Sequence, residues 1–234
     1  MPRVTTIFSA HLGTLYDFEG KVVVIIDVLR ATTTISTIMA KNPKMLMATD
    51  DVSFALDLKK NNSFLTVGER NGKKIPGFDF GNSPFELSKA ELKEKKLVIT
   101  TTNGTKIMKM AERADELLVG SFHNLDALIE RLLPEKREIV LFCAGWKGKV
   151  NMEDTLFAGA LASDLQISKF DLDDSSKIAW KTYLMYKENL LDCILECEHP
   201  KRLKTKFKKE DIKTGFERNK FGLVPKVREM QIIL

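Results

Sequence analysis

Short runs of apolar residues, each bounded by polar ones, alternate along the chain with stretches in which apolar residues recur at helical spacing. The clearest run covers 22–26 and consists of five consecutive Val and Ile residues. An unbroken β-branched run of this length is typical of a strand that is buried on both faces. The same reasoning predicts further strands at 3–8, 45–48, 63–67, 96–100, 116–120 and 138–142.

Helices are predicted between these strands, at 31–40, 52–61, 84–92, 104–114, 125–133 and 153–165. The last seventy residues are predicted to be mostly helical, with a short extended tail at 223–227. Because parallel strands require crossover connections, this alternation predicts a largely parallel or mixed sheet with helices on both faces. The expected fold class is therefore α/β, in three α/β/α layers, built as one sheet or as two related halves. We expect one unit over 1–234, with a subdivision near 120–135 as the alternative.

Composition adds a broad class to this picture. The chain has 234 residues, of which 44% are hydrophobic and 29% charged, and these values are typical of globular domains. No apolar stretch approaches the ~20 residues that span a bilayer, so we expect a soluble, cytoplasmic protein without membrane contacts. Three cysteines without paired spacing indicate neither a disulfide framework nor a zinc site.

The net charge of +5 is unevenly distributed. Six Lys and Arg residues lie within 201–209, where the only aromatic residue is Phe207. Without a binding motif or more interleaved aromatics, this run is interpreted as a solvated helix face, and no nucleic-acid partner is expected. A basic surplus also attracts small anionic ligands.

Four of the predicted strands end in polar or glycine-rich residues. Ligands of α/β proteins bind at the carboxyl ends of parallel strands, so these ends are expected to meet in one cleft. Asp27 and Arg30 follow one strand, and Glu69 and Arg70 follow another. The two carboxylates could hold Mg²⁺, which prefers oxygen ligands. The alternative is a network of Asp–Arg and Glu–Arg ion pairs that organises the loops.

A third strand runs directly into a turn of small polar residues, namely Thr101, Thr102, Asn103, Gly104 and Thr105. A helix is predicted to begin within this turn. Free backbone N–H groups and the positive end of the helix dipole make such a turn an anion site, most often for phosphate. The alternative is a capping turn in which Thr102 or Asn103 only completes the helix.

The fourth strand end is followed by Glu153 and Asp154 at the entrance of a predicted helix. Asp154 or Asn151 can cap this helix, which leaves the other acid free to bind a metal or act as a base. Cys143 ends a buried strand and has no histidine beside it in sequence, so we expect an inert thiol. Acid–base chemistry is expected from carboxylates or metal-bound water, because the histidines are isolated: His11, His123 and His199.

Taken together, these segments resemble the 2-phosphosulfolactate phosphatase family, which belongs to coenzyme M biosynthesis in methanogens and has bacterial relatives. The resemblance runs in order from about residue 22 to residue 161. It is carried by DVLRATTT at 27–34, GER at 68–70, GFDFGNSP at 77–84, TTNGT at 101–105, CAG at 143–145, ED at 153–154 and AG at 158–159.

The resemblance implies a magnesium-dependent phosphatase that hydrolyses 2-phospho-3-sulfolactate to 3-sulfolactate and phosphate, in a three-layer α/β/α fold. Two alternatives stay open at this point. The chain could act on another phosphorylated hydroxy acid, or it could be a non-catalytic anion-binding protein of the same fold. The expected partner is a small anionic phosphorylated substrate, and a homodimer is compatible with it.

These expectations lead to a hypothesis for the roles of the candidate residues. Metal-bound water attacks phosphorus with Glu153 as the proton acceptor, or Asp27 attacks directly and forms an aspartyl-phosphate. Arg30 is assigned to catalysis and, with Arg70, to binding the anionic groups of the substrate, because a guanidinium matches phosphate, carboxylate and sulfonate. The turn 101–105 is assigned to the phosphate. Mg²⁺ is assigned to Asp27, Glu69 and Asp154.

Overall fold

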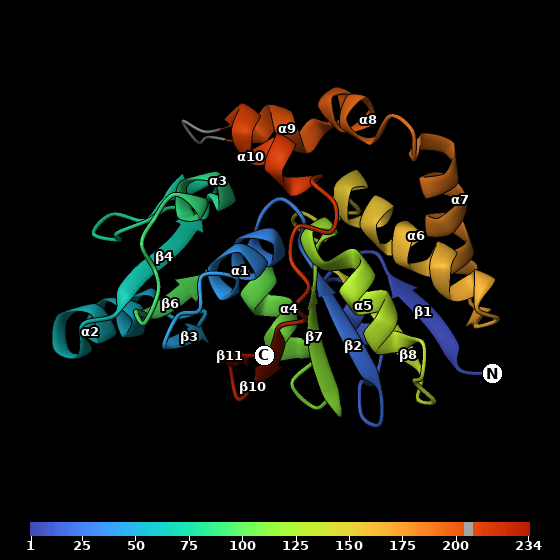
Figure 1. Ribbon diagram of the computed structural model, residues 1–234, viewed down its shortest axis with the longest axis horizontal. Coiled ribbons are helices and arrows are strands. Elements are labelled where there is room, and N and C mark those ends of the chain that lie inside the picture. Colours follow the sequence, from blue (N-terminus) through green and yellow to red (C-terminus); the bar gives the residue numbers. More distant parts are fainter. Residues whose placement is uncertain (204–207) are drawn as a thin grey trace.

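The chain folds around one large sheet with helices packed on both of its faces (Figure 1). The computed structural model describes residues 1–203 and 208–234, with the backbone alone at position 202. Within these residues the sheet has eleven strands. The α/β class and the three α/β/α layers predicted from the sequence are confirmed.

Most elements lie within a few residues of their predicted positions. The strands are β1 Arg3–Ile7, β2 Val22–Ile26, β3 Met45–Ala48, β4 Leu65–Arg70, β5 Lys73–Lys74, β6 Lys96–Thr100, β7 Glu116–Gly120, β8 Ile139–Cys143, β9 Asp171–Leu172, β10 Lys226–Arg228 and β11 Gln231–Ile233. The α-helices are α1 Ala31–Met39, α2 Val52–Asn62, α3 Pro84–Ser88, α4 Gly104–Met110, α5 Leu125–Leu132, α6 Met152–Ile167, α7 Asp174–Tyr186, α8 Leu190–Glu196, α9 Glu198–Arg202 and α10 Lys208–Gly215. Two 3₁₀ turns cover Leu12–Leu15 and Phe122–Asn124.

The sheet contains two groups of parallel strands joined by an antiparallel hairpin. Among the described residues the strand order is β5-β4-β6-β3-β11-β10-β7-β2-β8-β1-β9. Strands β4, β6 and β3 run parallel, as do β7, β2, β8, β1 and β9, while β10 and β11 pair antiparallel with each other and with β7 and β3. The sheet is therefore mixed. The strands of one parallel group, β3, β4 and β6, all lie within 45–100, whereas the other group takes strands from before and after this stretch. A domain division near 120–135 stays a prediction.

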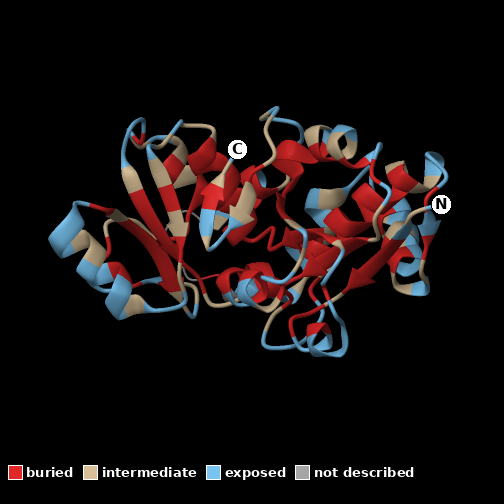
Figure 2. Cartoon of the chain, turned by 90° about the horizontal axis from the view of Figure 1, so that it is seen from below, coloured by how far each residue is buried: buried red, intermediate tan, exposed pale blue. Residues whose placement is uncertain are grey.

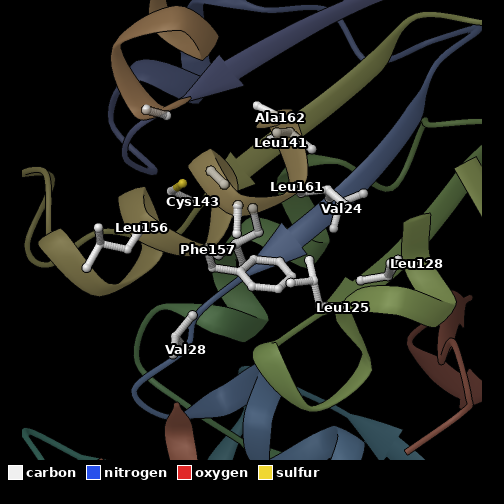
Figure 3. Close-up of a cluster of buried hydrophobic side chains, with 14 of the residues drawn as sticks. Val24, Val28, Leu125, Leu128, Leu141, Cys143, Leu156, Phe157, Leu161 and Ala162 are labelled. Atoms are coloured by element: carbon white, nitrogen blue, oxygen red, sulfur yellow. The ribbon is translucent and has the colours of Figure 1, made fainter. Parts of the chain in front are cut away.

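Strand β2 shows how the core is built. Val24 packs with α5 and α6 on one face, where Phe157 and Leu125 surround it (Figure 3). Val23 and Ile25 point to the other face and pack among residues of α1 and α4. All five residues of β2 are completely buried, as its apolar run predicts, and each contributes about 1.5–3 kcal/mol of hydrophobic stabilisation. The buried interior follows the strands through the whole molecule (Figure 2).

Two regions differ from the sequence prediction. Strand β4 continues to Arg70, three residues beyond its predicted end, because β5 pairs with Glu69 and Arg70 in a hairpin. The C-terminal tail is also more structured than expected. Instead of one short extended segment it forms the hairpin β10–β11, which fills the gap between the two parallel groups. That position depends on contacts across the chain, which a local hydrophobic pattern does not record.

No helix among the described residues is long and apolar enough to cross a membrane. The basic run at 201–209 is only partly described. Lys208 and Lys209 begin α10, whereas Lys204, Lys206 and Phe207 lie outside the described residues.

Candidate active site

The polar strand ends meet at a pocket that is also lined by His199 of α9 and by Leu203 after it. Helices α9 and α10 lie at the top of the molecule in Figure 1. Its volume is about 30 Å³. The polar lining consists of Asp27, Arg30, Glu69, Asn82, Asn103 and His199. Leu29, Trp146 and Leu203 supply the apolar part of the wall. The structure thus brings together candidate residues from the ends of β2, β4 and β6, and it adds two residues that the sequence analysis did not assign, Asn82 and His199.

Asp27 directly follows β2 and is 8% exposed. Its Oδ1 accepts a hydrogen bond from the N–H of Ala31 at 3.3 Å, and its own N–H donates to Thr32 Oγ1 at 3.1 Å. Its Oδ2 has no hydrogen-bond partner in the described part of the chain and lies 3.2 Å from the point where a Cβ on Gly104 would stand. Asp27 therefore offers one uncommitted carboxylate oxygen to the pocket.

Burial raises the pKa of Asp27 to about 6. The Ala31 N–H and the charge of His199 oppose this rise, and the charges of Glu69 and Glu153 add to it. Loss of hydration disfavours the charged form of a carboxyl, and nearby carboxylates do the same. A cation in the pocket would favour the charged form of Asp27 and so lower its pKa again, against both burial and the nearby carboxylates.

Arg30 is held by an acid from the far end of the chain. Its Nη1 donates to Asp211 Oδ2 at 2.8 Å, and both side chains are buried. Asp211 Oδ1 accepts a second hydrogen bond from Ser83 Oγ at 2.5 Å. This network joins the loop after β2 to α3 and α10 and fixes the guanidinium in the pocket wall.

Glu69 uses both carboxylate oxygens to hold neighbouring loops. Oε1 accepts from the N–H and the hydroxyl of Thr102, both at 2.8 Å, and Oε2 accepts from the N–H of Gly72 at 2.7 Å. Glu69 thus lies in the pocket wall, but its described contacts are those of a residue that orders the turn after β6.

The turn 101–105 is capped by a residue other than the two expected. Thr101 Oγ1 accepts from the N–H of Thr105 at 3.2 Å, and Thr105 Oγ1 donates to the Thr101 carbonyl at 2.8 Å. Asn103 makes no side-chain cap and lines the pocket, where it has no side-chain partner among the described residues. Gly104 is required here, because a Cβ at this position would lie 2.6 Å from the Cβ of Ala31.

The side chain of Arg70 binds backbone and hydroxyl groups. Its Nη1 donates to the carbonyl of Glu69 at 2.9 Å, and its Nη2 donates to the Asp50 carbonyl at 3.0 Å and to Thr100 Oγ1 at 2.9 Å. It is not among the residues that line the pocket. The two arginines that the sequence analysis paired are therefore separated by the structure.

Asp154 ties the loops after β2 and β8 together. Its Oδ1 accepts from the N–H of Val28 at 2.8 Å and its Oδ2 from the N–H of Gly145 at 3.1 Å. Asn151 is the residue that caps α6, through its Oδ1 and the N–H of Asp154. Burial, with the charges of Glu153 and Asp27, raises the pKa of Asp154 well above its usual range.

Glu153 is completely buried beside His199. Its Oε1 is hydrogen-bonded to Nδ1 of His199, and its Oε2 has no partner among the described residues. The imidazole also lies against the indole of Trp146, with ring centroids 5.3 Å apart. Glu153 is not part of the pocket lining and reaches it only through His199.

Cys143 is completely buried and takes no part in the pocket lining. Burial raises the pKa of its thiol well above the usual range, in agreement with the inert thiol expected from the sequence. All three cysteines are free.

The sequence analysis missed Asn82, Asp211 and His199. Asn82 is 3% exposed and its Oδ1 has no partner in the described part of the chain. It lies in the GFDFGNSP segment, so the family resemblance was a usable signal for it. His199 and Asp211 gave no local signal, because their partners Glu153 and Arg30 are 46 and 181 residues away in the sequence.

The pocket fits a hard cation through oxygen atoms, but not through the predicted set of three acids. Among the described residues, no three His, Cys, Asp or Glu side chains are grouped so that they could hold a metal ion. Asp154 and Glu69 use their oxygens on N–H and hydroxyl groups. Asp27 Oδ2 and the orphaned amide oxygen of Asn82 are of the type that Mg²⁺ accepts, and Mg²⁺ commonly binds through one or two carboxylates with water and substrate completing its shell.

Comparison of the sequence with known proteins places the chain in a family. The family model for 2-phosphosulpholactate phosphatase matches residues 8–230. A protein of Caldanaerobacter subterraneus subsp. tengcongensis, named as a probable 2-phosphosulfolactate phosphatase, is 38% identical over 216 residues, covering 91% of this chain and 90% of its own. Proteins with the same name are 36% identical over 201 residues in Thermotoga petrophila (86% and 83% coverage) and 39% identical over 169 residues in Carboxydothermus hydrogenoformans (71% and 70%).

Proposed function

The chain belongs to the 2-phosphosulfolactate phosphatase family, and we propose that it hydrolyses 2-phospho-3-sulfolactate to 3-sulfolactate and phosphate. The family consists of phosphoric monoester hydrolases. The observation that carries the proposal is that Asp27, with its uncommitted oxygen, and the buried guanidinium of Arg30 line the same pocket after β2. A carboxylate and a fixed cation in one pocket are the parts that phosphoryl transfer requires.

The substrate has three anionic groups, and we assign the charged and polar lining to them. Arg30 binds one of these groups, with its orientation set by Asp211. Asn103 and the turn 101–105 bind the phosphate, since the N–H groups of Asn103 and Gly104 have no acceptor among the described residues. A substrate-binding role for Arg70 stays a prediction that its described contacts do not favour.

Magnesium dependence is part of the proposal. Asp27 would hold the ion, together with the unpartnered amide oxygen of Asn82 in the same lining. Glu69 and Asp154 would keep the surrounding loops in place rather than bind directly. A bound Mg²⁺ would neutralise charge on the phosphate and favour attack at phosphorus. Burial raises the pKa of Asp27 to about 6, and a cation bound beside it would stabilise its charged form.

Two mechanisms remain for the attacking atom. Either a water molecule attacks phosphorus, or Asp27 attacks it through Oδ2 and is then released by water. Both use the same pocket and the same uncommitted oxygen. The cytoplasmic location, the place in coenzyme M biosynthesis and a homodimer also stay predictions.

A substrate screen tests the proposal. Phosphate release is measured with 2-phospho-3-sulfolactate, with 2-phospholactate and with other phosphorylated hydroxy acids, in the presence of Mg²⁺. We expect the highest kcat/KM for the sulfonated substrate. A higher value for an ester without the sulfonate would assign the chain to another hydroxy acid, and binding without phosphate release would indicate a non-catalytic anion-binding protein.

A further inference from the structure

His199 lies between the inner pocket and a wider groove. It lines the pocket with Asp27 and Arg30, and it also lines a groove of about 590 Å³ between α6, α7 and α9. The side chain is only 6% exposed. It is the histidine that the described residues place beside the candidate phosphate site, whereas His123 lies in the core under α10 and His11 is exposed.

The partner of His199 fixes which ring nitrogen can exchange a proton with a ligand. Nδ1 is engaged by Glu153, so this nitrogen carries a proton that it donates to the carboxylate. The second nitrogen, Nε2, has no hydrogen-bond partner in the described part of the chain, although the ring is almost entirely buried. The indole of Trp146 packs against the ring and limits its rotation.

This geometry differs from that of an ion pair which serves packing alone. Glu153 is completely buried, and its Oε2 has no partner, so the carboxylate is not optimised for stability. The arrangement of carboxylate, Nδ1–H and open Nε2 is the one in which a histidine passes protons in catalysis, with the carboxylate setting the tautomer and stabilising the imidazolium.

We propose that His199 is the catalytic acid that protonates the leaving oxygen of the phosphate ester, and that Glu153 is the residue that positions it. The inference rests on the proposed phosphatase function. In the sequence analysis Glu153 was the proton acceptor. Here His199 transfers the proton, and Glu153 acts only by orienting His199.

The atoms and protons balance over one turnover. The attacking oxygen forms a bond to phosphorus, the bond from phosphorus to the C2 oxygen breaks, and its electron pair stays on that oxygen. The Nε2 proton of His199 passes to the same oxygen and gives the free hydroxyl of sulfolactate. The water molecule that ends up on phosphorus, directly or after an aspartyl-phosphate step, then returns one proton to Nε2.

The test varies the leaving group. The protein is assayed with 2-phospho-3-sulfolactate and with its 3,3-difluoro analogue, whose leaving oxygen is a weaker base and needs less help from an acid. His199→Asn is compared with wild type and with His11→Asn, a control at an exposed histidine outside the pocket. We expect His199→Asn to lower kcat on the natural substrate by about 10²–10⁴-fold and on the analogue by much less. His11→Asn should leave both rates unchanged.

Equal losses on the two substrates, or no loss on either, would overturn the role of His199 as the acid. The absence of turnover by wild type would instead overturn the proposed function, so the two failures are distinguishable. Nitrogen-15 NMR of the wild-type imidazoles covers the case in which His199→Asn does not fold. Saturation with inorganic phosphate and sulfolactate should shift Nε2 of His199 and not the ring of His11, and an unmoved Nε2 would overturn the proposal.

Glu153→Gln tests the positioning role separately. The amide keeps the size of the side chain but removes the charge that stabilises the imidazolium. We expect kcat to fall while KM stays close to that of wild type, and the tautomer signature of His199 to change in the nitrogen-15 spectrum. An unchanged kcat, or an unchanged tautomer signature, would contradict the positioning role.

Discussion

Asp211 in α10 receives a hydrogen bond of 2.8 Å from Arg30 in the loop after β2, and both side chains are buried. The two residues are 181 positions apart in the sequence. The pair brings the C-terminal helices over the strand ends and holds the one arginine that lines the pocket among the described residues. The pocket is thus completed by the last part of the chain, which lies outside the motifs noted at 22–161 but within the family match at 8–230.

Asp211→Asn should therefore affect both stability and activity. It leaves the buried guanidinium of Arg30 without a charged partner, and breaking a buried pair costs about 3–5 kcal/mol. We expect a clear loss in the free energy of unfolding, measured with urea, and a higher KM. Glu217→Gln removes one member of the exposed pair with Lys220 and serves as the control, with an expected change of less than about 1 kcal/mol. Similar small losses for both variants would contradict the account of α10.

Asn103 and Thr105 should separate ligand binding from helix capping. Asn103→Ala removes a side chain that lines the pocket without a partner among the described residues, so we expect weaker substrate binding with an unchanged melting temperature. Thr105→Val removes the hydrogen bond to the Thr101 carbonyl and should cost about 1 kcal/mol of stability. The two variants are compared by KM and by thermal unfolding. A stability loss in Asn103→Ala without a change in KM would mean that the turn is only a cap.

The buried His123 should make stability depend on pH. Burial lowers its pKa to about 4, against the usual 6.5, while its Nε2 is hydrogen-bonded to the Thr214 carbonyl at 2.7 Å. Because the folded state disfavours the proton, His123 contributes stability above pH 6.5, and this contribution is lost as the pH falls toward 4. We expect the difference in unfolding free energy between wild type and His123→Asn to shrink by about 3 kcal/mol between pH 7 and pH 4. A difference that does not change with pH would contradict this assignment.

Removal of divalent metal should abolish phosphate release. After treatment with a chelator and dialysis, we expect turnover to fall to background and to return when Mg²⁺ is added. Binding of Mg²⁺ can also be followed without turnover, by calorimetry on wild type and on Asp27→Ala. Full turnover of the metal-free protein would exclude the proposed role of the ion.

The fold was largely predictable because its strands are buried on both faces. Runs such as 22–26 carry that information locally, and seven of the predicted strands appear in the described sheet. The hairpin β10–β11 was not predictable in its place, because two three-residue strands acquire their position from the neighbours β7 and β3.

The candidate site was predictable where a residue lies at the end of a strand or in the turn that follows it. Asp27, Arg30, Glu69 and Asn103 lie there and line the pocket. Residues that reach the pocket from the C-terminal helices have no such marker. An acid at a strand end also does not reveal whether its oxygens face the pocket or backbone N–H groups, and this is what separates Asp27 from Asp154.

The most direct test of the central claim is Asp27→Asn, assayed for turnover and for thermal unfolding on the same sample. Because burial disfavours the charge of Asp27, we expect the neutral amide to leave the melting temperature at neutral pH unchanged or higher. Phosphate release from 2-phospho-3-sulfolactate should fall by at least about 100-fold, since an amide is a poor metal ligand and cannot act as a nucleophile. Recovery at high Mg²⁺ would favour the ligand role over the nucleophile. Turnover close to that of wild type, whatever the melting temperature, would contradict the account and remove Asp27 from the active site.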